Sequence, residues 1–175
     1  TCRTMKIESL EIPDLKLITP QVLRDTRGYF MESFNQKEIE THINIRNFVQ
    51  DNESSSSYRV LRGLHYQQPP YAQAKLMHVI EGEVFDVSVD LRADSPTLGK
   101  YVALRLNGES KQLFYIPRGF AHGFLVMSDK AFLNKHKSVV KEVNKHPNLS
   151  IRKLAKITGV SVGTVQNVKS KMKTI

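Results

Sequence analysis

The sequence contains a single cysteine, and it lacks both a long apolar run and the charged-then-apolar pattern of a secretory leader. Cys2 cannot form a disulfide within the chain, which favours a reducing compartment. No segment approaches the roughly 18 consecutive apolar residues that a membrane-spanning helix needs. The first residues do not resemble a signal peptide. We therefore expect a cytoplasmic protein with no membrane association.

Acidic residues are scarce in only one part of the chain. The whole chain has 26 Lys and Arg against 17 Asp and Glu, which gives a net charge of +9. Residues 130–175 hold eleven of the basic residues and a single acid, Glu142, so this tail carries +10 and the first 129 residues carry −1. The asymmetry predicts a boundary near residue 130. We predict a domain over residues 1–129, a linker over 130–145 and a basic segment over 146–175.

The part before residue 130 shows the two-residue periodicity of β-strands. In "EVFDVSVDL", residues 83–91, apolar side chains alternate with Asp86, Ser88 and Asp90, which predicts one buried face and one solvent face. Residues 36–43 fit a short helix, and "NESSSSY", residues 52–58, fits a loop. Short strands separated by glycine-containing turns predict a mainly β sandwich or barrel.

The basic tail has a different periodicity, because apolar residues recur at helical spacing in "SIRKLAKITGVSVGTVQNVKSKM", residues 150–172. A small Ala155, a turn at Gly159 and an N-cap at Ser161 make the segment similar to the helix-turn-helix of recombinases and small regulators. The sequence therefore predicts a small α-helical tail after the β part.

This resemblance implies a recognition helix over residues 161–171. Gln166 and Asn167 would contact base edges, and Lys169 and Lys171 would contact phosphates. The alternative is a basic helical pair that only packs on the β part. We favour DNA binding because the cap and turn positions coincide with the concentrated positive charge.

Five blocks of the β part occur in the order and at the spacing seen in one enzyme family. They are "DTRGYFMESF", "FVQDNESSSS", "VLRGLHYQQPPYAQAKL", "GEVFDVSVDLRADSPTLGKYV" and "FYIPRGFAHGFLVMSD". They resemble those of the dTDP-4-dehydrorhamnose 3,5-epimerases over roughly residues 5–129. The resemblance implies a cupin-type jelly roll (a double-stranded β-helix) and a homodimer. It also implies that the substrate is dTDP-4-dehydro-6-deoxyglucose, a dTDP-4-keto-6-deoxy sugar nucleotide, epimerised in dTDP-L-rhamnose biosynthesis.

Epimerisation beside a ketone requires a base, a donor for the enolate oxygen and an acid on the opposite face. His65 has an ordinary pKa that suits a base, and Lys75 offers a localised positive charge for the oxygen. A single histidine on a strand is more often structural, but the five ordered blocks favour catalysis. The resemblance assigns these two roles and implies substrate contacts for six further residues, some across a dimer: Arg27, Glu32, Gln50, Asn52, Arg62 and His122.

A metal site is the main alternative chemistry for a cupin. "PRGFAH" supplies Pro117, Gly119 and His122, which match the second half of the cupin metal motif. In the first half, "HYQ" has Gln67 where a second histidine ligand would stand. Two imidazoles without a neighbouring carboxylate make a poor divalent site. We predict a metal-free site with no cofactor.

The resemblance ends after "FLVMSD". The family continues with a strand that carries a tyrosine acid, followed by a segment with an acidic residue that orients the base and an arginine for the nucleotide. In "AFLNKHK", Asn134 stands at the tyrosine position, and an amide cannot act as an acid. Inversion is then expected to be impaired unless Tyr66, Tyr71 or Tyr115 supplies the proton. Two functions stay open: an epimerase with a changed C-terminus, and a non-catalytic or vestigial sugar-nucleotide-binding cupin fused to a DNA-binding tail.

Overall fold

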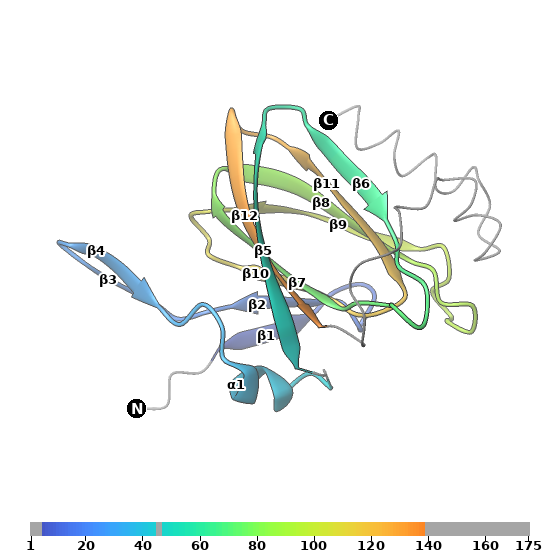
Figure 1. Cartoon of the computed structure of the whole chain (residues 1–175). Coiled ribbons are helices and arrows are strands. Elements are labelled where there is room, and N and C mark those ends of the chain that lie inside the picture. Colours follow the sequence, from blue (N-terminus) through green and yellow to red (C-terminus); the bar gives the residue numbers. More distant parts are fainter. Residues whose placement is uncertain (1–4, 45–46, 139–175) are drawn as a thin grey trace.

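The alternating segments of the β part pair into two antiparallel sheets (Figure 1). The structure, a computed structural model, describes residues 5–44 and 47–138. In sheet order, the six-stranded sheet contains β1 (Lys6–Ser9), β2 (Lys16–Thr19), β10 (Leu113–Ile116), β7 (Lys75–Glu81), β12 (Lys130–Ser138) and β5 (Phe48–Ser57). The four-stranded sheet contains β6 (Leu61–His65), β11 (Phe120–Val126), β8 (Glu83–Asp90) and β9 (Tyr101–Asn107). This arrangement confirms the predicted mainly β jelly roll.

A separate hairpin, β3 (Val22–Asp25) and β4 (Gly28–Met31), stands away from the two sheets in Figure 1. It exposes large apolar side chains: Leu23, Tyr29 and Phe30 are 39%, 50% and 61% exposed.

None of the helices among the described residues is long and apolar enough to cross a membrane.

The hydrophobic core lies between the two sheets. The alternation of each strand sends one set of side chains inward, and the members of this core include Leu15, Met77, Val79, Val84, Leu106, Phe114, Phe124, Val126 and Leu133. A second cluster, which includes Val87, Val89 and Ala121, covers the outer face of the four-stranded sheet. A third lies against the six-stranded sheet beneath α1 (Gln36–Glu40) and includes Ile39, Leu76 and Tyr115.

The short helix was predicted correctly, and the serine-rich loop was not. Asn35 caps α1 by accepting a hydrogen bond from the Glu38 backbone N–H at 3.1 Å, and Ile39 is buried. The segment predicted as a loop, residues 52–58, lies almost entirely in β5. β5 pairs with β12 along its length. These backbone hydrogen bonds outweigh the weak strand propensity of serine and asparagine.

The polar face of β8 does not face solvent, contrary to the sequence prediction. Asp86, Ser88 and Asp90 are each 0% exposed. The alternation itself was correct, because Val87 and Val89 pack on the outer face of the sheet. The polar residues point between the sheets, where other charged side chains meet Asp86. A two-residue period shows that two faces differ, and it does not show which of them solvent reaches.

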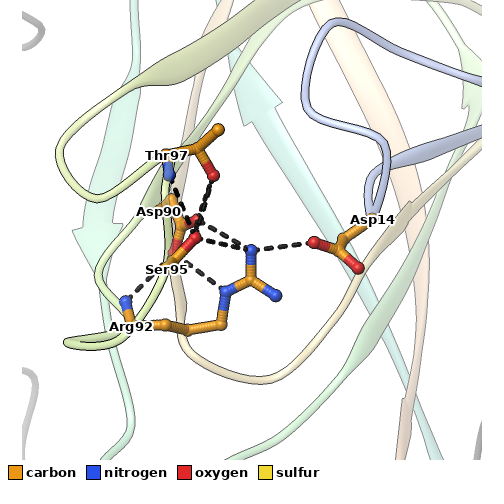
Figure 2. A network of polar contacts seen from close by, with 5 residues as sticks. All are labelled: Asp14, Asp90, Arg92, Ser95 and Thr97. Atoms are coloured by element: carbon orange, nitrogen blue, oxygen red, sulfur yellow. Dashed lines mark hydrogen bonds and ion pairs between the residues drawn. The ribbon is translucent and has the colours of Figure 1, made fainter.

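Asp90 belongs to a network of polar contacts at the end of β8 (Figure 2). Arg92 Nη2 lies 2.7 Å from Asp90 Oδ2 and 2.8 Å from Asp14 Oδ2. The hydroxyls of Ser95 and Thr97 each donate to Asp90 Oδ2 at 2.6 Å. Burial by itself would raise the pKa of Asp90, but the hydrogen bonds from Arg92, Ser95 and Thr97 outweigh burial and hold that pKa at about 2. The network ties the loop after β8 to the segment before β2.

The sheet continues beyond the boundary expected at residue 130. β12 covers residues 130–138 and lies between β7 and β5. The strand therefore occupies the first nine residues of the predicted linker, 130–145. The rest of that linker and the predicted helical segment 146–175 lie outside the described residues.

Candidate active site

Charged and polar side chains from five strands meet between the two sheets, at one end of the hydrophobic core. The four-stranded sheet contributes His65 on β6, Asp86 on β8 and His122 on β11. The six-stranded sheet contributes Lys75 on β7, and Lys135 and Lys137 on β12. Lys75, Asp86 and His122 are buried. The three lysines outnumber the one carboxylate in this interior group.

His122 and Asp86 form a buried hydrogen-bonded pair. Nε2 of His122 lies 2.9 Å from each of the two Asp86 carboxylate oxygens. Because a carboxylate only accepts hydrogen bonds, we assign the proton of the neutral ring to Nε2. Burial lowers the pKa of His122 to about 4 despite the opposing effect of Asp86, and Lys135 and Lys75 lower it further. At neutral pH His122 is uncharged, with Nδ1 as its acceptor nitrogen.

Lys75 is a buried amine with a strongly lowered pKa. Lys75 is only 7% exposed. Burial, together with the charges of Lys135 and Lys137, lowers its pKa to about 7, and Asp86 opposes the shift. Both the protonated and the neutral amine are therefore present near neutral pH.

His65 shares the interior face with His122. β6 and β11 are antiparallel, and their register places His65 directly opposite His122. Side chains of directly opposite residues project to the same face of a sheet. Two glycines allow the strands to approach here: a Cβ on Gly63 would lie 2.5 Å from the Cα of Gly123. Side chains at either position would push β6 and β11 apart.

Gln50, Asn52 and Arg62 border the same group. Gln50 Nε2 and Asn52 Oδ1 are 3.1 Å apart. When the Asn52 amide is turned so that its oxygen faces Lys137, that oxygen accepts a hydrogen bond from Lys137 Nζ at 2.7 Å. Arg62 Nε donates to the Ser56 hydroxyl at 2.8 Å. The structure thus brings together six of the predicted residues: His65, Lys75, Gln50, Asn52, Arg62 and His122.

Arg27 and Glu32 do not join this group. Arg27 lies at the turn of the β3–β4 hairpin, where its guanidinium bonds the Asp25 carboxylate at 2.6 and 3.1 Å. Glu32 follows β4 and is exposed. The hairpin stands away from the barrel in Figure 1, so these two residues do not line the site within one copy of the chain.

Several polar residues of the interior could not be found from the sequence pattern. Asp86 was placed on a solvent face, and Lys135 and Lys137 were placed in a linker. Ser88 lies directly opposite His122 on the neighbouring strand, and its buried hydroxyl has no hydrogen-bond partner among the described residues. A charged residue at every second position of "NKHK" was the available signal for the two lysines.

Asn134 does not face this interior, contrary to the position inferred for it. Leu133 belongs to the core between the sheets. The charges of Asp86 and Arg62, on the opposite sheet, shift the pKa of Lys135, so Lys135 also points between the sheets. Successive residues of a strand point to opposite faces. Asn134 therefore lies on the outer face of β12, opposite His78 of β7. Lys135 is the residue that this part of β12 directs into the barrel.

Residues that could hold a metal ion are also absent from the described part. Within residues 5–44 and 47–138, no group of three or more His, Cys, Asp and Glu side chains is placed to hold one. A histidine hydrogen-bonded to one carboxylate and surrounded by lysines is better suited to binding an anionic oxygen than a divalent cation.

The sequence model of the dTDP-4-dehydrorhamnose 3,5-epimerase family matches residues 9–168 of this chain. The chain belongs to this family. A dTDP-4-dehydrorhamnose 3,5-epimerase from Shigella flexneri is 55% identical over 128 residues, which are 73% of this chain and 71% of that protein. The family membership confirms the isomerase class predicted from the five sequence blocks.

Solved structures of epimerases agree with the fold. An epimerase from Legionella pneumophila, crystallised with dTDP-4-keto-L-rhamnose, is 47% identical, with a TM-score of 0.75 over 79% of this chain and 73% of its own. The Mycobacterium tuberculosis epimerase is 30% identical, with a TM-score of 0.75 over 96% of this chain and 100% of its own. The helix-turn-helix prediction for the tail, with Gln166, Asn167, Lys169 and Lys171, concerns residues outside the described part and stays a prediction.

Proposed function

We propose that this member of the family epimerises dTDP-4-dehydro-6-deoxyglucose at the two carbons beside its ketone, in dTDP-L-rhamnose biosynthesis and without a metal. The observation that carries the proposal is the placement of His65 and His122 on one sheet and Lys75 on the other, around a single barrel interior. A sugar bound between the sheets would have imidazoles on one side and an amine on the other. This is the arrangement that enolate chemistry needs.

In this proposal His65 removes the proton from the carbon beside the ketone. The electron pair of that C–H bond moves into the new C=C bond, and the carbonyl electrons move onto the oxygen. The Lys75 ammonium stabilises the resulting oxyanion. His122 directs its Nε2–H to Asp86, so its Nδ1 is left to accept a hydrogen bond from a sugar hydroxyl.

The low pKa of Lys75 makes it an effective stabiliser of the enolate. In the empty site, burial and two neighbouring lysines disfavour its positive charge. The negative oxygen of the enolate removes that penalty. Lys75 therefore gains more stabilisation from the intermediate than from the neutral ketone, and such a difference accelerates a reaction.

The nucleotide end of the substrate would lie against β5. Gln50 and Asn52 offer amide groups there, and Lys137 and Arg62 add positive charge for a diphosphate. We propose that Arg27 and Glu32 reach this end from a second copy of the chain, because the hairpin that carries Arg27 and directly precedes Glu32 stands away from its own barrel. The exposed Leu23, Tyr29 and Phe30 on that hairpin favour contact with a partner copy.

Turnover of the purified full chain tests the enzymatic proposal. With dTDP-4-dehydro-6-deoxyglucose as substrate, NMR should show dTDP-4-dehydrorhamnose forming without added metal and in the presence of a chelator. Calorimetry should also show dTDP binding, weakened when Asn52 is replaced by alanine. An unchanged substrate, together with no heat of binding at millimolar dTDP, would contradict both the catalysis and the sugar-nucleotide binding proposed here.

Light scattering tests the homodimer. The full chain should have twice its monomer mass of 20.0 kDa, and Phe30→Ser should shift it toward the monomer. A monomeric wild type at the concentrations used for activity would rule out the contribution of Arg27 and Glu32 from a second copy.

For the basic tail we propose DNA binding as a role separate from epimerisation. Its support is the charge of +10 over residues 130–175. Three of these cations lie on β12, at residues 130, 135 and 137. The remaining eight lie beyond it in the sequence, and we propose that they contact phosphates.

A further inference from the structure

Lys135 projects from β12 across the barrel toward the opposite sheet. Its ammonium lies 6.0 Å from the ring centroid of Phe124, which belongs to β11 of the four-stranded sheet. The charge of Asp86 on β8 raises the pKa of this ammonium, and the charge of Arg62 on β6 lowers it. Lys135 is therefore an amine of the six-stranded sheet that faces strands β6, β8 and β11, including the strands that carry His65 and His122.

The position of Lys135 relative to His65 matters because inversion requires two faces. A base on one side of a sugar ring removes a proton, and an acid on the other side must return one. His65 belongs to the four-stranded sheet and Lys135 to the six-stranded sheet. A sugar held between the sheets would have these two groups on opposite faces.

Five of the six tyrosines, all within the described residues, are directed away from the interior between the sheets. Tyr66 and Tyr101 pack on the outer face of the four-stranded sheet, and Tyr115 packs on the outer face of the six-stranded sheet. Tyr29 and Tyr58 are exposed. The remaining tyrosine, Tyr71, lies on the loop after β6. Burial also raises the pKa of Tyr66, and it raises that of Tyr115 to about 12, which makes both phenols weaker acids.

We propose that Lys135 is the general acid of the epimerisation, returning a proton to the face of the sugar opposite His65. This assignment rests on the epimerase function proposed above, and it replaces the tyrosine acid that the sequence lacks on β12.

The proton balance closes with these two groups. His65 takes the proton from the carbon and becomes imidazolium, and the enolate forms. The C=C electron pair of the enolate then takes a proton from the Lys135 ammonium on the other face, the ketone reforms, and Lys135 is left as a neutral amine. Exchange with water returns one proton to Lys135 and removes one from His65, which completes the cycle without an oxidant or reductant.

The surroundings of Lys135 suit an acid that works at neutral pH. Burial lowers its pKa to about 8, Asp86 opposes the shift, and Lys137 and Arg62 add to it. Lys75 also faces it from β7, and His122 faces it in neutral form. The amine is thus mostly protonated at pH 7 and releases its proton far more readily than an exposed lysine.

The test separates proton removal from inversion in the full chain. Wild type, Lys135→Met, Lys135→Arg and the control Lys130→Met are incubated with dTDP-4-dehydro-6-deoxyglucose in heavy water, and NMR follows both deuterium at the carbons beside the ketone and inverted product. Lys130 starts the same strand but is exposed. Circular dichroism confirms that each variant is folded.

We expect Lys135→Met to keep deuterium exchange, since His65 can return deuterium to the face from which it took the proton. Inverted product should fall by about 100-fold or more, the usual contribution of a positioned acid. Lys135→Arg should not restore inversion, because a guanidinium keeps the charge but does not release a proton. Lys130→Met should behave as wild type.

Three results would overturn the assignment while leaving the epimerase function intact. They are inversion by Lys135→Met at the wild-type rate, equal loss of exchange and inversion, and full activity in Lys135→Arg. The second would place Lys135 in proton removal or binding, and the third would limit it to electrostatic stabilisation. Absence of exchange in the wild type would instead contradict the proposed function, and the assignment of Lys135 would fall with it.

Discussion

Asp86 holds His122 through contacts of 2.9 Å from Nε2 to both carboxylate oxygens, and the two side chains are 0% and 1% exposed. The same carboxylate raises the pKa of Lys75 and of Lys135 against the lowering effect of burial. One buried negative charge therefore sets the tautomer of a histidine and keeps two neighbouring amines closer to their protonated forms.

Replacing Asp86 by asparagine should shift the pH range of activity. The loss of its charge lowers the pKa of Lys75 and Lys135 further, so both amines lose their protons at lower pH. The basic limb of kcat/KM against pH should move to lower pH, and the maximal rate should fall. The exposed Asp94→Asn provides the control. A basic limb that stays in place in Asp86→Asn would show that neither amine has to be protonated for the reaction.

Lys75 should also make the protein more stable as the solution becomes more basic. Its pKa is about 7 in the folded state against an ordinary value of 10.5, so between these values the unfolded chain binds more protons. The free energy of unfolding then rises with pH, by up to about 1.4 kcal/mol per pH unit for one such group. Denaturant unfolding from pH 7 to 9.5 measures the slope.

Lys75→Met should remove the part that Lys75 contributes to the slope of unfolding free energy against pH. Lys100 lies on a loop and is exposed, so Lys100→Met should leave the slope unchanged. Lys135, with its pKa of about 8, contributes in the same direction above pH 8. Equal slopes in wild type and Lys75→Met would mean that Lys75 is solvated in the folded protein.

Much of the fold could be predicted from the sequence, because it depends on local patterns. The alternation in residues 83–91 identified a strand, and the acidic stretch over residues 36–43 identified α1. The loop predicted at residues 52–58 failed because its strand character comes from β12, which lies some eighty residues later in the chain. Pairing of distant strands leaves little trace in a local window.

The site was predicted only in part for a related reason. His65, Lys75 and His122 could be found by the resemblance of their sequence blocks. Asp86 and Lys135 could not, since alternation does not reveal which face of a strand points into the barrel. Counting forward from the last matching block also put Asn134 where the structure directs Lys135, because a difference of one position exchanges the two faces.

The Asp90 network predicts a large difference between two ion pairs. Asp90→Ala removes the buried carboxylate that accepts hydrogen bonds from Arg92, Ser95 and Thr97, and it should lower the free energy of unfolding by about 3 kcal/mol. Glu83→Ala removes a surface pair with Arg105, 2.9 Å apart, and should cost at most about 1 kcal/mol. Urea unfolding of both variants gives the comparison. Equal losses would show that the contacts in Figure 2 contribute no more than a surface pair.

The basic tail predicts DNA binding that depends on salt more than on sequence. In gel shifts with the full chain, replacing Lys169, Lys171 and Lys173 by glutamine should weaken binding to all duplexes and lower the dependence on salt. Replacing Gln166 and Asn167 by alanine should remove sequence preference and leave the salt dependence nearly unchanged. A wild-type chain that forms no complex at low salt would limit the tail to packing.

Deuterium transfer from solvent measures the step on which the proposed function depends, the removal by His65 of a proton from a carbon beside the ketone. In heavy water the wild type should place deuterium at both carbons flanking the ketone of dTDP-4-dehydro-6-deoxyglucose. His65→Ala should reduce the rate by at least about 100-fold, and the exposed His42→Ala should match the wild type. Exchange at the wild-type rate in a folded His65→Ala variant would contradict the assignment of His65 as the base.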